Sequence, residues 1–128
     1  MNWLITISGI FAFFTVAGHF TVGSKEYLTP MLEETFDPVA RKVMHCVFHY
    51  VSVFLILSAL ALLLIGTGTM PFQGSARLVQ FIGLNFAAFA VWQIILASTS
   101  GIPRGAVKMF QWVFFILISA FALIGAAG

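Results

Sequence analysis

Four apolar stretches, each long enough to cross a lipid bilayer, dominate this sequence. They cover residues 3–23, 39–66, 76–98 and 106–127. A helix needs about 20 consecutive apolar residues to cross the hydrocarbon core. Charged residues make up only 8% of the chain, against about 25% in soluble domains. We therefore predict an all-α polytopic integral membrane protein. Residues 1–128 would form a single domain, a compact bundle of four transmembrane helices.

The connections between the stretches carry residues that begin or end helices. Asp37 precedes Pro38, a pair typical of a helix N-cap followed by proline at the first helical position. Residues 66–71 end the second stretch, and residues 100–103 separate the third from the fourth. Residues 24–37 are the only long connection. We expect an interfacial loop here, with a short helix from Thr29 and Pro30 that lies at the level of the lipid headgroups.

The basic residues predict an orientation, because five of the six fall at one predicted membrane face. This face carries Lys25, Arg41, Lys42, Arg104 and Lys108, and the opposite face carries Arg77. The positive-inside rule places the first group in the cytoplasm. Both termini would then lie outside. No organelle signal is evident, so we expect a bacterial inner (plasma) membrane.

The net charge and the small residues of the spans indicate which partners to expect. The net charge is +2 without a basic run, which argues against nucleic-acid binding and leaves the lipid bilayer as the expected environment. Glycine, alanine and serine recur along the first, third and fourth spans. Such residues allow close helix contact. They predict packing within the chain or, alternatively, the seam of a homo-oligomer or of a larger membrane complex.

Three histidines are the candidate functional residues, since ionisable groups inside a membrane are costly and suggest function. His19 falls in the last turns of the first span, and His45 and His49 fall in the first turns of the second. The latter two are four residues apart and share a helix face. Because the chain reverses between the two spans, we expect all three to converge near the cytoplasmic face. Glu26 continues the stripe of His19, and Gln93 is at comparable depth.

Several ligands would suit such a cluster. Two histidines on facing helices can hold haem b, with Arg41 beside its propionates. Three imidazoles can hold a transition metal, with Glu26 or Cys46 as a further ligand. A histidine can also carry a proton near neutral pH. Finally, the histidines can simply lie solvated at the interface.

The sequence therefore predicts a small membrane protein with a histidine-rich site that binds a metal, haem or a proton. His19, His45, His49 and Arg41 are the candidate cofactor-binding residues. His19, His45, His49 and Glu26 are the candidate metal ligands. The alternative is a non-catalytic oligomeric channel or transport protein, or an accessory subunit of a membrane complex. Enzyme activity is not expected, because Cys46 and His49 lack an orienting acid within the span.

Overall fold

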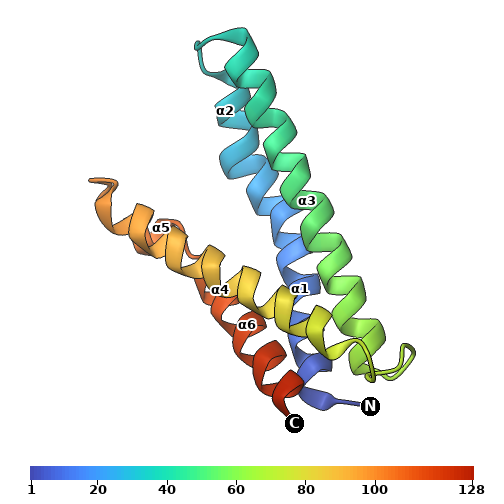
Figure 1. Ribbon diagram of the computed structural model, residues 1–128. Helices are drawn as coiled ribbons and strands as arrows, with labels where there is room; N and C mark the ends of the chain where they lie inside the picture. The colour runs from blue at the N-terminus through green and yellow to red at the C-terminus, as the bar shows by residue number, and fades with distance from the viewer.

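A computed structural model describes residues 1–128 as helices joined by short connections, without strands (Figure 1). The elements are α1 (Trp3–Gly18), the π-helix η1 (His19–Leu28), α2 (Thr29–Glu33), α3 (Pro38–Gly66), α4 (Ala76–Thr99), α5 (Gly105–Lys108) and α6 (Gln111–Ala127). The all-helical class predicted from the sequence is confirmed.

Three helices are long and apolar enough to cross a membrane. They are the continuous helix Trp3–Glu33, α3 and α4. The apolar helix α6 is shorter, with 17 residues, which span about 25 Å against a hydrocarbon core of about 30 Å. The predicted fourth span begins at residue 106, whereas the structure breaks this segment at Met109 (φ −105°, ψ 62°). A fourth crossing by α6 therefore stays a prediction.

The first helix does not end near Gly23 but continues to Glu33 through η1 and α2. Much of the loop expected over residues 24–37 is therefore helical. Pro30 has no N–H to donate, and its ring crowds the carbonyl four residues earlier. A wider turn relieves this crowding: the backbone N–H of Thr29 bonds to the carbonyl of Ser24, five residues back. The chain leaves the helix at Glu34.

The start of α3 follows the predicted capping pattern. One carboxylate oxygen of Asp37 accepts hydrogen bonds from the backbone N–H groups of Val39 (3.0 Å) and Ala40 (2.9 Å). Pro38 takes the first helical position, where its missing N–H is not needed. These contacts fix the start of α3, which runs antiparallel to the extended first helix (Figure 1).

The helices form two arms that meet at one end and diverge at the other (Figure 1). One arm contains α1, η1, α2 and α3, and the other contains α4, α5 and α6. The helix α1 packs against both α3 and α6, whereas α3 and α4 contact each other little. The buried core lies at the junction of the arms and includes Ile5, Leu62, Val79, Phe86 and Ile118.

Both termini lie at the closed end of the arms. The backbone N–H of Asn2 donates to the carbonyl of Gly66 (2.7 Å), and its side-chain amide donates to the carbonyl of Gly125 (2.8 Å). This arrangement agrees with termini on one side of the membrane. The side itself stays a prediction.

Small residues bring these helices together within one chain. A Cβ atom built on Gly66 would lie 2.5 Å from the backbone nitrogen of Thr6, and one on Gly125 would lie 2.7 Å from a side-chain carbon of Ile5. The predicted role of small residues in packing within the chain is therefore seen at these positions.

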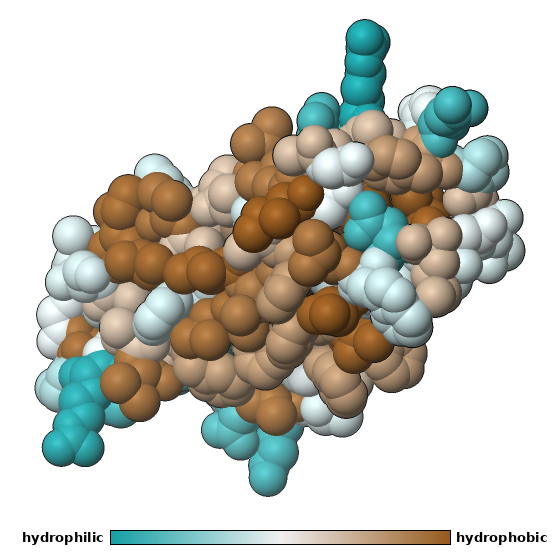
Figure 2. All heavy atoms as spheres, turned by 90° about the horizontal axis from the view of Figure 1, so that it is seen from below, coloured by the Kyte–Doolittle hydropathy of each residue, from teal (hydrophilic) through white to brown (hydrophobic).

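The outer surface is largely apolar. Figure 2 shows hydrophobic residues across the middle of the molecule, with most hydrophilic side chains toward its margins. Large exposed side chains such as Phe13, Leu57, Phe81 and Trp92 cover both arms. Such a surface suits lipid rather than water.

Candidate functional site

A cavity of about 110 Å³ lies between the extended first helix, α3 and α6. Its lining combines an apolar wall with a few polar groups. The polar side chains that line it are Thr15, His19, Tyr27 and Gln111. Phe48, Val51, Leu55, Phe114 and Phe115 form the apolar part of the wall.

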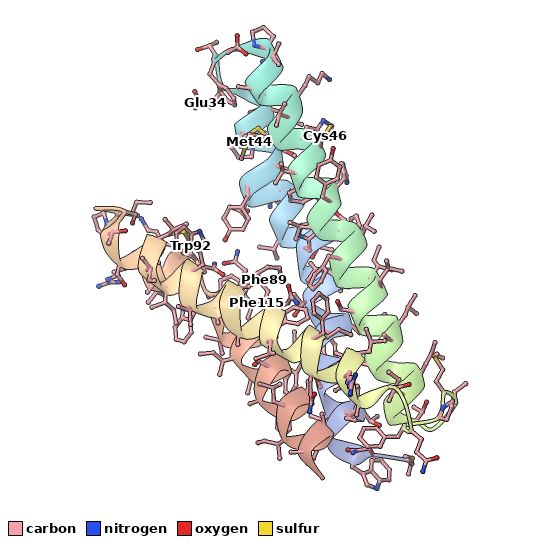
Figure 3. All side chains as sticks on the ribbon, viewed as in Figure 1. Glu34, Met44, Cys46, Phe89, Trp92 and Phe115 are labelled. Carbon is pink, nitrogen blue, oxygen red and sulfur yellow. The ribbon has the colours of Figure 1, made fainter.

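A larger, more open hollow of about 600 Å³ adjoins this cavity along α4. Val51 and Phe115 line both spaces. Figure 3 shows Phe89, Trp92 and Phe115 on the side of the α4–α6 arm that faces the other arm. Near the junction, the rings of Phe54 and Phe89 lie 5.4 Å apart, and Phe89 and Phe115 lie 5.9 Å apart. These aromatic contacts close the inner end of the hollow.

His19 is half-buried at the wall of the smaller cavity. Its ring stacks on Phe48 at a centroid distance of 4.0 Å, with 17° between the planes. Its Nε2 lies 2.9 Å from the Oγ of Ser52. The Ser52 hydroxyl also bonds to the carbonyl oxygen of Phe48 (3.1 Å), so the imidazole is held by two neighbouring turns of α3.

One tautomer of His19, with its proton on Nε2, satisfies both of these bonds. In it the single proton of the Ser52 hydroxyl is donated to the Phe48 carbonyl. The Oγ of Ser52 accepts from Nε2–H of His19. In the neutral ring, Nδ1 is therefore a hydrogen-bond acceptor. Nδ1 has no hydrogen-bond partner in the protein. Every buried side-chain nitrogen or oxygen does have a partner, so Nδ1 is not buried and is accessible.

Gly23 leaves room beside this nitrogen. A Cβ atom built on Gly23 would lie 3.8 Å from Nδ1 of His19 and 3.8 Å from the ring of Phe48. Gly23 also lines the cavity. The free acceptor of His19 therefore faces the part of the cavity that a glycine keeps open.

The break between α5 and α6 places Gln111 at the same cavity. Side chains satisfy the carbonyls at this break: Gln93 donates to Met109 (3.2 Å), Tyr27 donates to Lys108 (3.1 Å) and Trp112 donates to Ala106 (2.9 Å). Gln93 also donates to the side-chain oxygen of Gln111 (2.6 Å). The amide nitrogen of Gln111 makes no hydrogen bond within the protein.

The other predicted site residues do not line this cavity, although the ring of His49 contacts Phe48 of its wall at 5.5 Å. His45 and His49 lie together on α3, with their Nε2 atoms 3.2 Å apart, and His49 is exposed. Glu26 is exposed and lines neither space. Arg41 donates to the carbonyls of Leu32 (3.3 Å) and Glu34 (3.4 Å) near the end of α2. No group of three or more His, Cys, Asp or Glu side chains is placed to hold one metal ion.

Sequence reasoning missed Tyr27 and Phe48 as site residues. It used the α-helical spacing that puts Glu26 seven residues after His19 on one face. The π-helical turns hold more residues per turn, so that Tyr27, one position later, lines the cavity with His19. Pro30 is the residue that could have indicated this departure from α-helical spacing, since a proline within a helical pattern is a common cause of a local change in the helix.

No family model, curated protein or solved structure matches this chain. Function must therefore be inferred from the chemistry of the site.

Proposed function

We propose that this chain is a small integral membrane protein that binds a lipophilic molecule with a hydroxyl-bearing head in the cavity beside His19. The accessible, unpartnered Nδ1 of His19 carries the proposal. We also propose that this site lies at the cytoplasmic end of the protein.

The polar groups specify the head of the ligand. Nδ1 of His19 needs a donor, and the amide nitrogen of Gln111 needs an acceptor. A hydroxyl group provides both. Inside a membrane an unpaired polar group costs several kcal/mol, so a ligand that pairs these groups gains affinity from the site itself.

The adjoining hollow suits the apolar part of the ligand. Its volume of about 600 Å³ lies within the range of small-molecule sites, about 300–1,000 Å³. Its lining is apolar except for Gln93. Because the hollow opens between the two arms, the ligand would enter sideways from the bilayer.

A matched pair of probes tests the proposal. The protein in lipid nanodiscs would be labelled with a photoreactive hexadecanol and, separately, with its methyl ether, which lacks the donor. We expect the alcohol to crosslink to η1 and α6. The ether should label about tenfold less, since one lost hydrogen bond of about 1.4 kcal/mol changes an equilibrium tenfold.

Two variants localise the binding. His19→Ala should weaken labelling by the alcohol to the level of the ether. Gly23→Ala should weaken it without loss of fold, because the added methyl group meets only ordinary contacts while it narrows access to Nδ1. Phe13→Ala, at an exposed position on α1, is the control. Equal labelling by alcohol and ether, or labelling unaffected by His19→Ala, would refute the proposal and favour a cleft filled by water, lipid or a protein partner.

A further inference from the structure

The histidine pair on α3 lies outside the cavity, although the ring of His49 packs edge-on against Phe48 of the cavity wall at 5.5 Å. Nε2 of His45 and Nε2 of His49 lie 3.2 Å apart, and the ring centroids are 5.0 Å apart. Neither ring lines the cavity beside His19 or the hollow along α4. This pair is therefore available for a second interaction.

The distance between the two nitrogens fits one metal ion. A bond from histidine nitrogen to zinc is about 2.0–2.1 Å long. Two such bonds across a separation of 3.2 Å enclose an angle of about 100° at the ion. This angle lies between the values for octahedral and tetrahedral coordination. Little movement of either ring is needed.

The surroundings leave the other coordination positions open. The guanidinium of Arg41, one turn before His45, donates to the carbonyls of Leu32 and Glu34 rather than to the pair. No further His, Cys, Asp or Glu side chain joins the pair in a metal-binding group. Water is the remaining ligand.

Water can reach this part of α3 because the helix is longer than the membrane is thick. Its 29 residues span about 43 Å, whereas the hydrocarbon core is about 30 Å thick. His45 and His49 lie seven and eleven residues after Pro38 at the start of α3, or about 10 and 16 Å along the axis. The excess length of about 13 Å falls between these values, so the pair lies at the membrane surface when α3 extends beyond the core at this end.

We propose that His45 and His49 form a two-histidine clip for a divalent transition metal ion, with water in the remaining positions. Neutral imidazole suits zinc, copper and nickel. On binding, the ring that donates the hydrogen bond moves its proton from Nε2 to Nδ1. Both Nε2 lone pairs then face the ion, and no net proton is released.

Metal binding to the intact protein tests this clip. The protein would be purified in mild detergent without a histidine tag, stripped with chelator and titrated with Zn²⁺ in a calorimeter. We expect one ion per chain. His45→Ala or His49→Ala should weaken binding about a hundredfold, because the second ligand acts at high effective concentration. Electron paramagnetic resonance of bound Cu²⁺ should show coupling to two nitrogens, and to one in each variant.

Two control variants separate this clip from other sites. His19→Ala removes the cavity histidine and should leave Zn²⁺ affinity unchanged, whatever it does to labelling by the alcohol. His49→Ala/Lys42→His places a histidine three residues before His45, at an exposed position nearer the start of α3, and should recover part of the affinity. Equal binding by all variants, loss of binding in His19→Ala, or one ion shared by two chains would each overturn the proposal.

Discussion

Replacing Gly66 with alanine tests the junction of the two arms. The new Cβ atom would lie 2.5 Å from the backbone nitrogen of Thr6 and 2.8 Å from its Cα. Neither backbone atom can move alone, so α1 and α3 must separate by about 1 Å, an overpacking that typically costs about 1–3 kcal/mol. The separation also lengthens the hydrogen bond from Asn2 to the Gly66 carbonyl, which is 2.7 Å long.

Gly18→Ala is the matched control for Gly66→Ala, because a Cβ atom at Gly18 meets nothing within 4 Å. Alanine contributes about 0.5–1 kcal/mol of helix stability relative to glycine. The difference in the free energy of unfolding between the two variants therefore isolates the steric cost of the close contact at Gly66. Reversible unfolding in mixed micelles of mild detergent and sodium dodecyl sulfate, followed by circular dichroism, measures both. If Gly66→Ala is as stable as Gly18→Ala, the close contact between α1 and α3 is refuted.

Three further predictions concern contacts and orientation. Ser8→Ala removes the hydrogen bond that the buried Ser8 hydroxyl donates to the carbonyl of Ile118 (2.7 Å). It should lower the free energy of unfolding by about 0.6 kcal/mol, a typical value for a hydrogen bond between membrane helices, and the same micelle assay would detect it. Tyr27→Phe removes a hydrogen bond between η1 and α5 and should broaden the distances between spin labels on the two arms in pulsed electron paramagnetic resonance; an unchanged distribution would contradict this. In a Cys46→Ser background, an impermeant maleimide added to intact cells should label Thr69→Cys but not Thr35→Cys, and the opposite pattern would reverse the orientation.

The helices themselves could be predicted from the sequence because length and apolar content suffice for membrane spans. Asp37 and Pro38 likewise mark the start of α3 by local chemistry alone. The divergence of the two arms could not be predicted, because it depends on which helix faces make contact. The apolar residues surround each helix and show no single buried face.

The separation of the three histidines follows from where the chain reverses. A turn directly after Gly23 would set His19 level with the first turns of α3 and so near His45. The first helix instead continues to Glu33, and the chain reverses over the next few residues. His19 is therefore paired with Ser52, seven residues or about 10 Å further along α3 than His45. The continuation of the first helix through the π-helix η1 and α2 sets this register, and no periodicity in the apolar pattern reveals it.

The cavity beside His19 lies where α6, which packs against α1, is shorter than the helices of the other arm. The first helix and α3 have 31 and 29 residues, whereas α6 has 17, a difference of about 20 Å in length. The helix α6 therefore cannot cover the full face of the longer helices. Gln111 begins α6 at the point where this cover ends, and the break at Met109 frees carbonyls that Tyr27 and Gln93 satisfy. The polar groups of the site thus gather where α6 begins, and irregular backbone at membrane depth is tolerated only beside protein or a filled cavity.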